Sequence, residues 1–387
     1  MKFISSAGSD KPGVTPKQQL IATCAAFFIL GVVFATWASR IPAIRDASML
    51  TPVTLGYALL GRGMGTILIM PAVTGLIHRV GPKKASMFFG VLLILSLIPM
   101  AVAPDWTILT VVLFVTGAGA SGYNISINAL GSKIEASTGR SHMSKIHSWF
   151  GVGNVAGALA GTAMASQEFS VSLHFWGTAT LLLVILMGLY RYLPEGGKDP
   201  KALKAGFKLP HGGLLWLGVI CFVAASIEDS IMNWVTLFFT DYVGTTEGLA
   251  PIGYSAYAVS MLIMRLAGDR LKPRFGAKAL ITSGSVIAAS GVLISILSPN
   301  LIVASVGFVM AGAGVALTFP MIFSAAGKEG AVALATVATM GALGGMVSQP
   351  VMGYLVDNFT LTGGFIFICI CMLAVGGGSQ KARLLKK

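Results

Sequence analysis

The sequence predicts an all-α integral membrane protein in which twelve transmembrane helices form two pseudo-symmetric six-helix bundles. Three observations carry this prediction: an apolar composition, twelve long apolar segments, and a pattern that recurs in both halves of the chain. Of the 387 residues, 55% are hydrophobic and only 11% are charged, whereas soluble domains have roughly 25% charged residues. The mean hydropathy is +0.81. This composition excludes a soluble enzyme and a disordered chain.

Twelve segments are long enough to cross a bilayer, which takes about 20 mainly apolar residues in a helix. Their sequences do not alternate between apolar and polar residues as the strands of an outer-membrane barrel do. Among the prolines inside these segments, Pro71, Pro320 and Pro350 either kink their helices or are tolerated in lipid. The segments span residues 17–39, 52–77, 84–103, 107–131, 146–166, 171–192, 213–240, 250–269, 278–298, 301–325, 331–355 and 361–377.

The basic residues predict the orientation of these segments. Lys and Arg gather in the short cytoplasmic loops of bacterial membrane proteins. With the N-terminus inside, 23 of the 27 Lys and Arg residues fall on the inner side. We therefore expect a multi-pass protein of the bacterial inner membrane with both termini in the cytoplasm. The net charge of +13 then reflects attraction to the lipid bilayer and not a nucleic-acid partner.

A repeat divides the chain into two halves. Three short patterns recur in order at offsets of 195 to 197 residues, which indicates an internal duplication. We predict an N-terminal six-helix bundle at 1–193, a cytoplasmic linker at 194–212 and a C-terminal six-helix bundle at 213–387. The matches pair Trp37 with Trp234, Leu55-Gly56-Tyr57 with Ile252-Gly253-Tyr254, and Arg79-Val80-Gly81-Pro82-Lys83 with Arg274-Phe275-Gly276-Ala277-Lys278.

The loop after the second segment carries a family resemblance. Gly75-Leu-Ile-His78-Arg79-Val-Gly81-Pro-Lys83-Lys84, together with twelve helices and a basic central loop, resembles the major facilitator superfamily. His78 stands where the family usually has an acidic residue. The second copy is weaker, with Pro273 at the equivalent position and Asp269 nearby. The resemblance implies a gating role for His78, Arg79, Gly81, Lys83, Asp269 and Arg274.

A narrower resemblance covers most of the chain. Phe34-Ala-Thr-Trp37-Ala-Ser-Arg40-Ile-Pro42-Ala-Ile-Arg45-Asp46 is similar to the first helix of bacterial inner-membrane permeases of the YbjJ and MosC types, in the fucose-permease-like branch. Glu228 through Asn233-Trp234 resembles their seventh-helix motif, in which Glu is followed five residues later by Asp-Trp. Asn233 replaces that aspartate here. The resemblance implies a permease and supplies no substrate.

Two adjacent carboxylates lie about fifteen residues into the segment 213–240, near the middle of the membrane. An ionisable group at this depth costs about 2.5–3.5 kcal/mol on insertion scales. Because neighbouring positions point about 100° apart, one carboxylate faces a central cavity and the other a neighbouring helix. Burial disfavours the charged form of a carboxyl group, which suits reversible protonation. We hypothesise that Glu228 is the proton-coupling group and Asp229 its auxiliary; the alternative is a static structural carboxylate.

Two arginines lie within helical segments. Arg62 is near mid-depth, where its partner is a carboxylate of the segment 213–240 or an anionic substrate; the alternative is a side chain that snorkels outward. Arg265 is near the inner end of its segment. Because Asp269 follows four residues later, we expect a local ion pair or a gating contact there.

Amides and aromatic rings suggest how a solute is bound. Amides donate and accept hydrogen bonds, and rings cover the apolar faces of a sugar. The alternative is interhelical hydrogen bonding, worth about 0.6 kcal/mol on average. His147 is an interfacial residue, a gate or a proton relay. The candidate binding residues are Trp37, Arg62, Asn124, Asn128, Asn154, Asn233, Trp234, Phe319 and Gln349.

No nucleotide-binding loop, His-Glu-x-x-His metal site or Gly-x-Ser-x-Gly elbow occurs in the sequence. We therefore expect no enzymatic activity, cofactor or metal. The function that we expect is that of a monomeric secondary active transporter, whose partners are a small polar solute such as a sugar or polyol, protons and lipid. Proton-coupled symport by alternating access is the leading form. The alternatives are a proton-coupled exporter of a metabolite or drug, and a membrane sensor that binds without transport.

Overall fold

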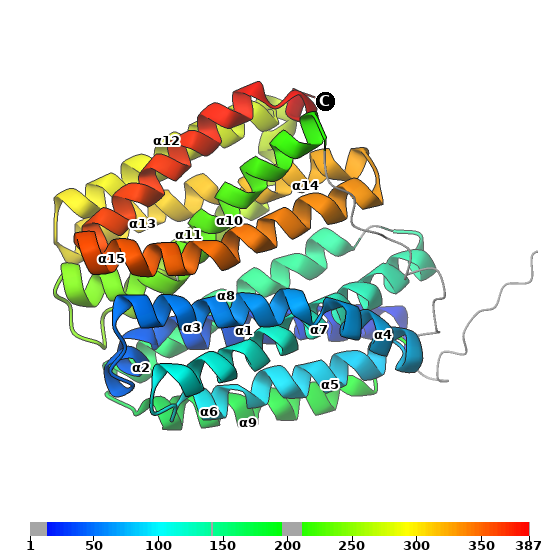
Figure 1. The fold of residues 1–387 in the computed structure, drawn as a ribbon. Helices are drawn as coiled ribbons and strands as arrows, with labels where there is room; N and C mark the ends of the chain where they lie inside the picture. Colours follow the sequence, from blue (N-terminus) through cyan, green and yellow to red (C-terminus); the bar gives the residue numbers. More distant parts are fainter. Residues whose placement is uncertain (1–13, 141, 196–210, 387) are drawn as a thin grey trace, which may run out of the picture.

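Several helices in the structure begin at a side chain that caps their first turn. The computed structural model describes residues 14–140, 142–195 and 211–386, apart from the side chains at 144, 269, 331 and 386, and its regular structure is helical throughout these ranges (Figure 1). The Thr15 hydroxyl caps α1 (Pro16–Ser39) in a capping box, and Thr51 caps α3 (Pro52–Leu68) in the same way. Both helices begin with proline, which is pre-organised for the first turn.

The N-terminal half contains six spans, two of them broken. The bend between α3 and α4 is 43°, and it falls directly before Pro71, which cannot donate the backbone hydrogen bond that would continue the helix. A short helix, α2 (Ile41–Ala47), follows α1. The spans are α1, α3 with α4 (Met70–Val80), α5 (Pro82–Leu95) with α6 (Leu97–Met100), α7 (Trp106–Thr138), α8 (Met143–Ser166) and α9 (Val171–Tyr190).

The C-terminal half repeats this plan. A π-helical turn, Phe238–Tyr242, extends its first helix, and non-helical Phe359 and Thr360 divide α15 into parts 331–358 and 361–381. Pro320 lies just after a helix break, and Pro350 remains inside a helix. The elements are α10 (Gly213–Leu237), α11 (Pro251–Phe275), α12 (Ala277–Leu297), α13 (Leu301–Val315) with α14 (Thr318–Lys328), α15 (Ala331–Lys381) and the 3-10 turn Arg383–Lys386.

These elements confirm the predicted all-α membrane fold with twelve spans. Among the described residues, eight helical runs, α5 with α6 and α13 with α14 included, are long and apolar enough to cross a membrane, and the bent pair α3 and α4 adds a ninth. The remaining spans are α8, α11 and the second part of α15. The repeat is also visible locally, because Gly81 and Gly276 begin equivalent helices with φ of 81° and 76°, a conformation that favours glycine.

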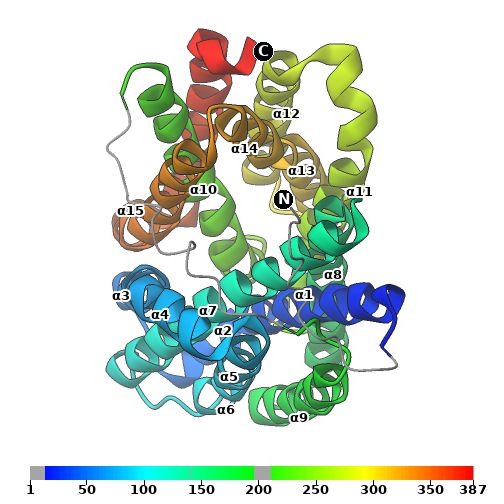
Figure 2. The same ribbon diagram turned by 90° about the vertical axis from the view of Figure 1, so that its right-hand side faces the viewer.

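The halves lie side by side along their long axes (Figures 1 and 2). Within the halves, α1 packs along α8 and α10 along α15, while α8 with α11 and α3 with α15 join the two. We name the two ends of the molecule by their contents. The α2 end carries α2 and the loops 47–51, 243–250 and 298–300, at the left of Figure 1. The terminal end carries both described chain termini. Residues 196–210, most of the predicted linker, lie outside the described residues.

Candidate functional site

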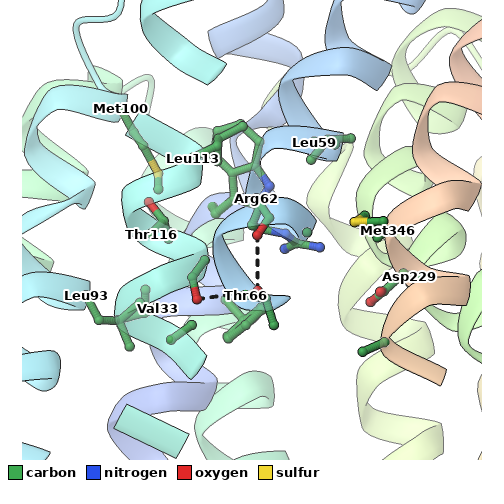
Figure 3. A pocket seen from close by; sticks show the side chains of 17 residues that line it. Val33, Leu59, Arg62, Thr66, Leu93, Met100, Leu113, Thr116, Asp229 and Met346 are labelled. Carbon is green, nitrogen blue, oxygen red and sulfur yellow. Dashed lines mark hydrogen bonds between the residues drawn. The ribbon is translucent and has the colours of Figure 1, made fainter. Parts of the chain in front are cut away.

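A cavity of about 200 Å³ lies between the two halves and is lined by both. Most of its wall is apolar, with residues from α1, α3, α5, α6, α7, α10 and α15. Two charged side chains face each other across it: Arg62 from α3 and Asp229 from α10 (Figure 3). Thr66 and Thr116 add hydroxyl groups to the N-terminal side. The cavity therefore combines an apolar lining with one cation and one carboxylate.

The Arg62 side chain contacts an aromatic ring, and its backbone contacts Thr66 and Gly117. Its guanidinium carbon lies 5.5 Å from the centre of the Phe34 ring, which permits a cation–π interaction. The Thr66 hydroxyl donates to the Arg62 carbonyl at 3.1 Å, as Figure 3 shows. Gly117 of α7 lies directly against this turn of α3. The guanidinium itself is directed across the cavity towards Asp229.

The two adjacent carboxylates have different surroundings. Arg265 Nη2 lies 3.1 and 3.2 Å from the two carboxylate oxygens of Glu228. Asp229 instead faces Arg62 in the other half and lies against Gly345 of α15. The expected split between the two carboxylates is therefore present, with Asp229 on the large cavity. Glu228 is not among the described residues that line that cavity, and both carboxylates line a smaller adjoining cavity of about 130 Å³.

Arg265 has a partner that the sequence did not predict, Glu228 of α10. It was placed near the end of a segment that stops at residue 269, whereas α11 continues through Pro273 to Phe275. Arg265 therefore lies ten residues before the end of the helix, at a depth where it reaches Glu228. Its Nε also donates to the Ala316 carbonyl at 3.3 Å. The side chain of Asp269 lies outside the described part of the structure.

Trp37 and Asn233 join the halves beside the cavity. Trp37 Nε1 donates to Asn233 Oδ1 at 3.3 Å, and Asn233 Nδ2 donates to the Asp229 carbonyl at 2.7 Å. Both residues line the smaller cavity, and Trp37 also lines the larger one. Of the predicted binding residues, Trp37, Arg62 and Asn233 are thus brought together with Asp229.

Other predicted binding residues are engaged elsewhere. Trp234 Nε1 donates to Gln349 Oε1 at 3.2 Å, and both side chains are only 1% exposed. Asn154 accepts from the Tyr254 hydroxyl at 2.9 Å, across the α8–α11 contact. Phe319 lies beside Glu228 in a small separate pocket. In this conformation Trp234 and Gln349 satisfy each other and are not among the described residues that line the cavity.

The amides of α7 lie towards the terminal end. Asn128 Nδ2 donates to the Asn124 carbonyl at 2.9 Å, and His147 Nε2 lies 3.0 Å from Asn128 Oδ1. The His147 ring lies 4.7 Å from that of Phe27. These residues form a polar cluster on the N-terminal half that is separate from the described lining of the central cavity.

The predicted gating loops also lie at the terminal end. Lys83 is buried, and its Nζ lies 2.8 Å from Glu195 Oε1. Arg79 and Arg274 are exposed, and His78 is half-buried in the last turn of α4. Lys83 thus attaches the start of α5 to the chain that follows α9, a contact within one half.

The sequence interpretation missed two arginines at the α2 end. Arg45 pairs with Asp241, with Nη2 and Oδ1 3.1 Å apart, and also with Asp46 at 2.8 Å. Burial alone lowers the pKa of Arg45, but hydrogen bonds to Asp241 and Asp46 raise it above its usual value. Arg40 is 4% exposed, lies 3.2 Å from Glu247 and donates to the Phe169 carbonyl. Burial lowers the pKa of Arg40, and Glu247 partly offsets this.

These ion pairs join the halves, and further contacts lie near them. The Thr236 hydroxyl donates to the Ala38 carbonyl at 3.2 Å, and the hydroxyls of Thr162 and Ser255 lie 3.3 Å apart. Together with the Trp37–Asn233 hydrogen bond, they tie the halves from the cavity to the α2 end. No group of three or more metal-ligating side chains occurs among the described residues.

Two bacterial proteins are similar to this chain over nearly its whole length. It is 27% identical over 374 residues to an uncharacterised MFS-type transporter of Yersinia pestis, with 96% of each chain covered. It is 26% identical over 370 residues to the membrane protein MosC of Rhizobium meliloti, covering 93% of this chain and 89% of MosC.

Solved structures share the fold at low sequence identity. A variant of the nucleoside transporter NupG matches with a TM-score of 0.74 and 13% identity, covering 95% of this chain and 97% of NupG. A variant of the E. coli fucose:proton symporter FucP matches with a TM-score of 0.65 and 16% identity, covering 94% and 98%. A model of the Major Facilitator Superfamily matches residues 20–331. With the twelve-helix fold, this match shows that the chain belongs to the major facilitator superfamily of transporters.

Proposed function

We propose that this transporter moves a small polar solute, such as a sugar or polyol, across the bacterial inner membrane by proton-coupled alternating access. The observation that carries the proposal is the juxtaposition of Arg62 and Asp229 across a cavity lined by both halves. A rocking motion of one half against the other exposes such a cavity to each side of the membrane in turn.

The size and lining of the cavity favour a small solute. Its volume of about 200 Å³ is below the roughly 300–1,000 Å³ of pockets for drug-sized ligands. Trp37 and Phe34 offer aromatic surface beside hydroxyl and charged groups. The similar structures of a nucleoside transporter and a fucose:proton symporter agree with a solute that carries hydroxyl groups.

The surroundings of the two carboxylates suggest which one carries the proton. Arg265 neutralises Glu228 within the C-terminal half, so its charge is compensated in every orientation of the two halves. The compensating cation of Asp229 is on the other half, and a rocking motion changes their separation. We therefore propose Asp229 as the exchanging group and Glu228 as its auxiliary, the reverse of the assignment made from the sequence.

We further propose that both termini lie in the cytoplasm and that the protein works as a monomer. The basic loops, including those of Lys83 and Arg274, are at the terminal end, in line with the distribution of Lys and Arg in bacterial membrane proteins. The α2 end is then the outer side, and the contacts of Arg40 and Arg45 close it. In this orientation the cluster of Asn124, Asn128 and His147 lies on the solute's path to the cytoplasm.

Proteoliposomes test the proposal. Purified protein, reconstituted and screened against L-fucose, D-ribose, myo-inositol and nucleosides, is expected to exchange at least one solute in counterflow. An imposed pH gradient should drive net uptake of that solute. Asp229→Asn should retain counterflow and lose the response to the gradient, because exchange needs no net proton movement.

Asp357→Asn is the matched control, since Asp357 is an exposed carboxylate of α15. It should behave as wild type. An unchanged pH response in Asp229→Asn would contradict the coupling assignment. Binding without exchange would instead favour a sensor.

A further inference from the structure

We infer that the solute is a hydroxyl-bearing monocarboxylate, that is, a sugar acid, whose carboxylate takes the place of Asp229 opposite the Arg62 guanidinium. The inference rests on the proposed function and on one juxtaposition: an arginine and an aspartate face each other across the cavity from different halves.

The charges around Asp229 come from three helices. Glu228 is adjacent on α10 and is paired with Arg265 of α11. This pair is neutral and stays within one half. Arg62 and Asp229 are then the charges left to interact with a solute. The titratable and charged groups close enough to interact with Asp229 are Arg62, Glu228, Tyr254 and Tyr257.

The side chains of Arg62 and Asp229 differ in their ability to change protonation state. A guanidinium keeps its proton in proteins, whereas a carboxylate can take one up. The pair of Arg62 and Asp229 therefore switches between net charges of 0 and +1 and never reaches −1. A cationic solute needs a site of charge −1, which this pair cannot provide. A monoanion matches the +1 state, in which Asp229 is protonated.

The geometry at Arg62 suits a carboxylate. Within the described part of the chain, the guanidinium contacts the Phe34 ring and donates no hydrogen bond. Its planar fork is complementary to a carboxylate in a bidentate arrangement. The hydroxyls of Thr66 and Thr116 donate to backbone carbonyls, which leaves their oxygens free to accept from solute hydroxyls. The cavity thus offers a site that can bind a carboxylate, beside hydroxyl oxygens that can accept hydrogen bonds from a polyol.

The binding step balances in charge and protons. The solute carboxylate forms an ion pair with Arg62 and so comes between the guanidinium and the Asp229 carboxylate that faces it. A carboxylate left without a partner in a low-dielectric cavity is costly, so Asp229 takes a proton from the side to which the cavity is open. Release of the solute on the other side leaves Arg62 facing Asp229 again, and Asp229 gives up its proton there. One anion and one proton cross together, and no net charge moves.

Matched ligand pairs test the substrate class. Thermal denaturation of the purified protein would be followed with D-gluconate against D-glucitol, D-glucuronate against D-glucose, and D-galacturonate against D-galactose. We expect at least one acid to raise the melting temperature while its neutral counterpart does not. Stabilisation by neutral members alone, or by no acid in the panel, overturns the inference.

Two variants tie the effect to Arg62. Arg62→Gln should weaken binding of the stabilising acid at least tenfold, because the fork is lost. Arg62→Lys keeps the charge without the fork and should show an intermediate affinity, which guards against a Gln variant that does not fold. Equal binding by wild type and both variants contradicts the inference.

Uptake of the same acid into proteoliposomes tests the charge balance. An inside-alkaline pH gradient should drive its accumulation, while a potential imposed with potassium and valinomycin should change the rate less than twofold. Proton-coupled uptake of a neutral sugar instead, or uptake that responds to the potential, refutes the sugar-acid inference and leaves the proposed function standing. An acid that binds and is never exchanged in counterflow refutes the proposed function itself.

Discussion

Arg265 and Glu228 form an ion pair between α11 and α10, in which one guanidinium nitrogen lies 3.1 and 3.2 Å from the two carboxylate oxygens. The side chains are 28% and 17% exposed, so the pair is mostly withdrawn from solvent. Its two members belong to the same half and can move together. The pair therefore stabilises the C-terminal half and compensates one of two adjacent carboxylates.

Removal of both members should cost less than the sum of the two single removals. Glu228→Gln leaves the Arg265 charge without its partner, and we expect a loss of about 1–3 kcal/mol in stability, the cost of an unsatisfied buried group. The double variant with Arg265→Gln should lose less than the sum of the single losses. Thermal unfolding in detergent measures both.

Arg270→Gln provides the control for this prediction, because Arg270 is exposed on the same helix. It should change stability by no more than a few tenths of a kcal/mol. Strictly additive losses in the double variant would show that the ion pair carries no coupling energy.

The ion pair of Arg45 with Asp241 should hold the α2 end closed. Asp241→Asn removes this contact between the halves, and an exposed pair is worth about 0.2–1 kcal/mol. The population open at the α2 end should then rise by up to about fivefold. Spin labels at Met49→Cys and Thr246→Cys, in a chain whose four native cysteines are replaced by serine, report this as a longer distance component.

Asp46→Asn separates this effect from a general loss of charge. Asp46 also pairs with Arg45, at 2.8 Å, but both residues belong to α2. Its removal breaks no contact between the halves, and we expect the distance distribution of the parent protein. A longer component of equal size in both variants would argue against a gate at Asp241.

Trp234 and Gln349 should contribute to stability and not to binding. Gln349→Met leaves the buried Trp234 Nε1 without its acceptor at 3.2 Å, and the expected cost is about 1–3 kcal/mol. The affinity for a solute should change less than twofold, because neither residue is among the described residues that line the cavity. A tenfold loss of affinity with unchanged stability would restore the binding role assigned from the sequence.

Much of the fold could be predicted from the sequence because a membrane-spanning helix is recognisable as a long segment of apolar residues. The expected spans correspond to the observed helices, and the break before Pro71 follows from the missing backbone donor. The expected segment 250–269 is shorter than α11 for a related reason. A charged stretch ends the apolar segment at residue 269, yet α11 continues to Phe275, because a helix outside lipid tolerates charge.

The contacts between the halves could not be predicted from local spacing. The partners of Arg40 and Arg45 lie about 200 residues away, at Glu247 and Asp241. The internal repeat does, however, indicate where one contact between the halves can form. Residues separated by the repeat offset are related by the pseudo-symmetry and can meet where equivalent helices cross, as Trp37 and Asn233 do at a separation of 196.

Gly345 sets the position of the Asp229 carboxylate, and its replacement should separate proton coupling from stability. A Cβ at this site of α15 would overlap an Asp229 carboxylate oxygen, so Gly345→Ala should turn that side chain away from Arg62. Alanine also favours a helix over glycine by roughly 0.5–1 kcal/mol, which offsets part of the cost. We therefore expect a small change in unfolding temperature and at least a tenfold loss of gradient-driven uptake in proteoliposomes. A methyl group added by Gly377→Ala, in the second part of α15, meets no atom within 4 Å and should leave uptake unchanged; equal uptake by the two variants would show that contact with Gly345 does not position Asp229.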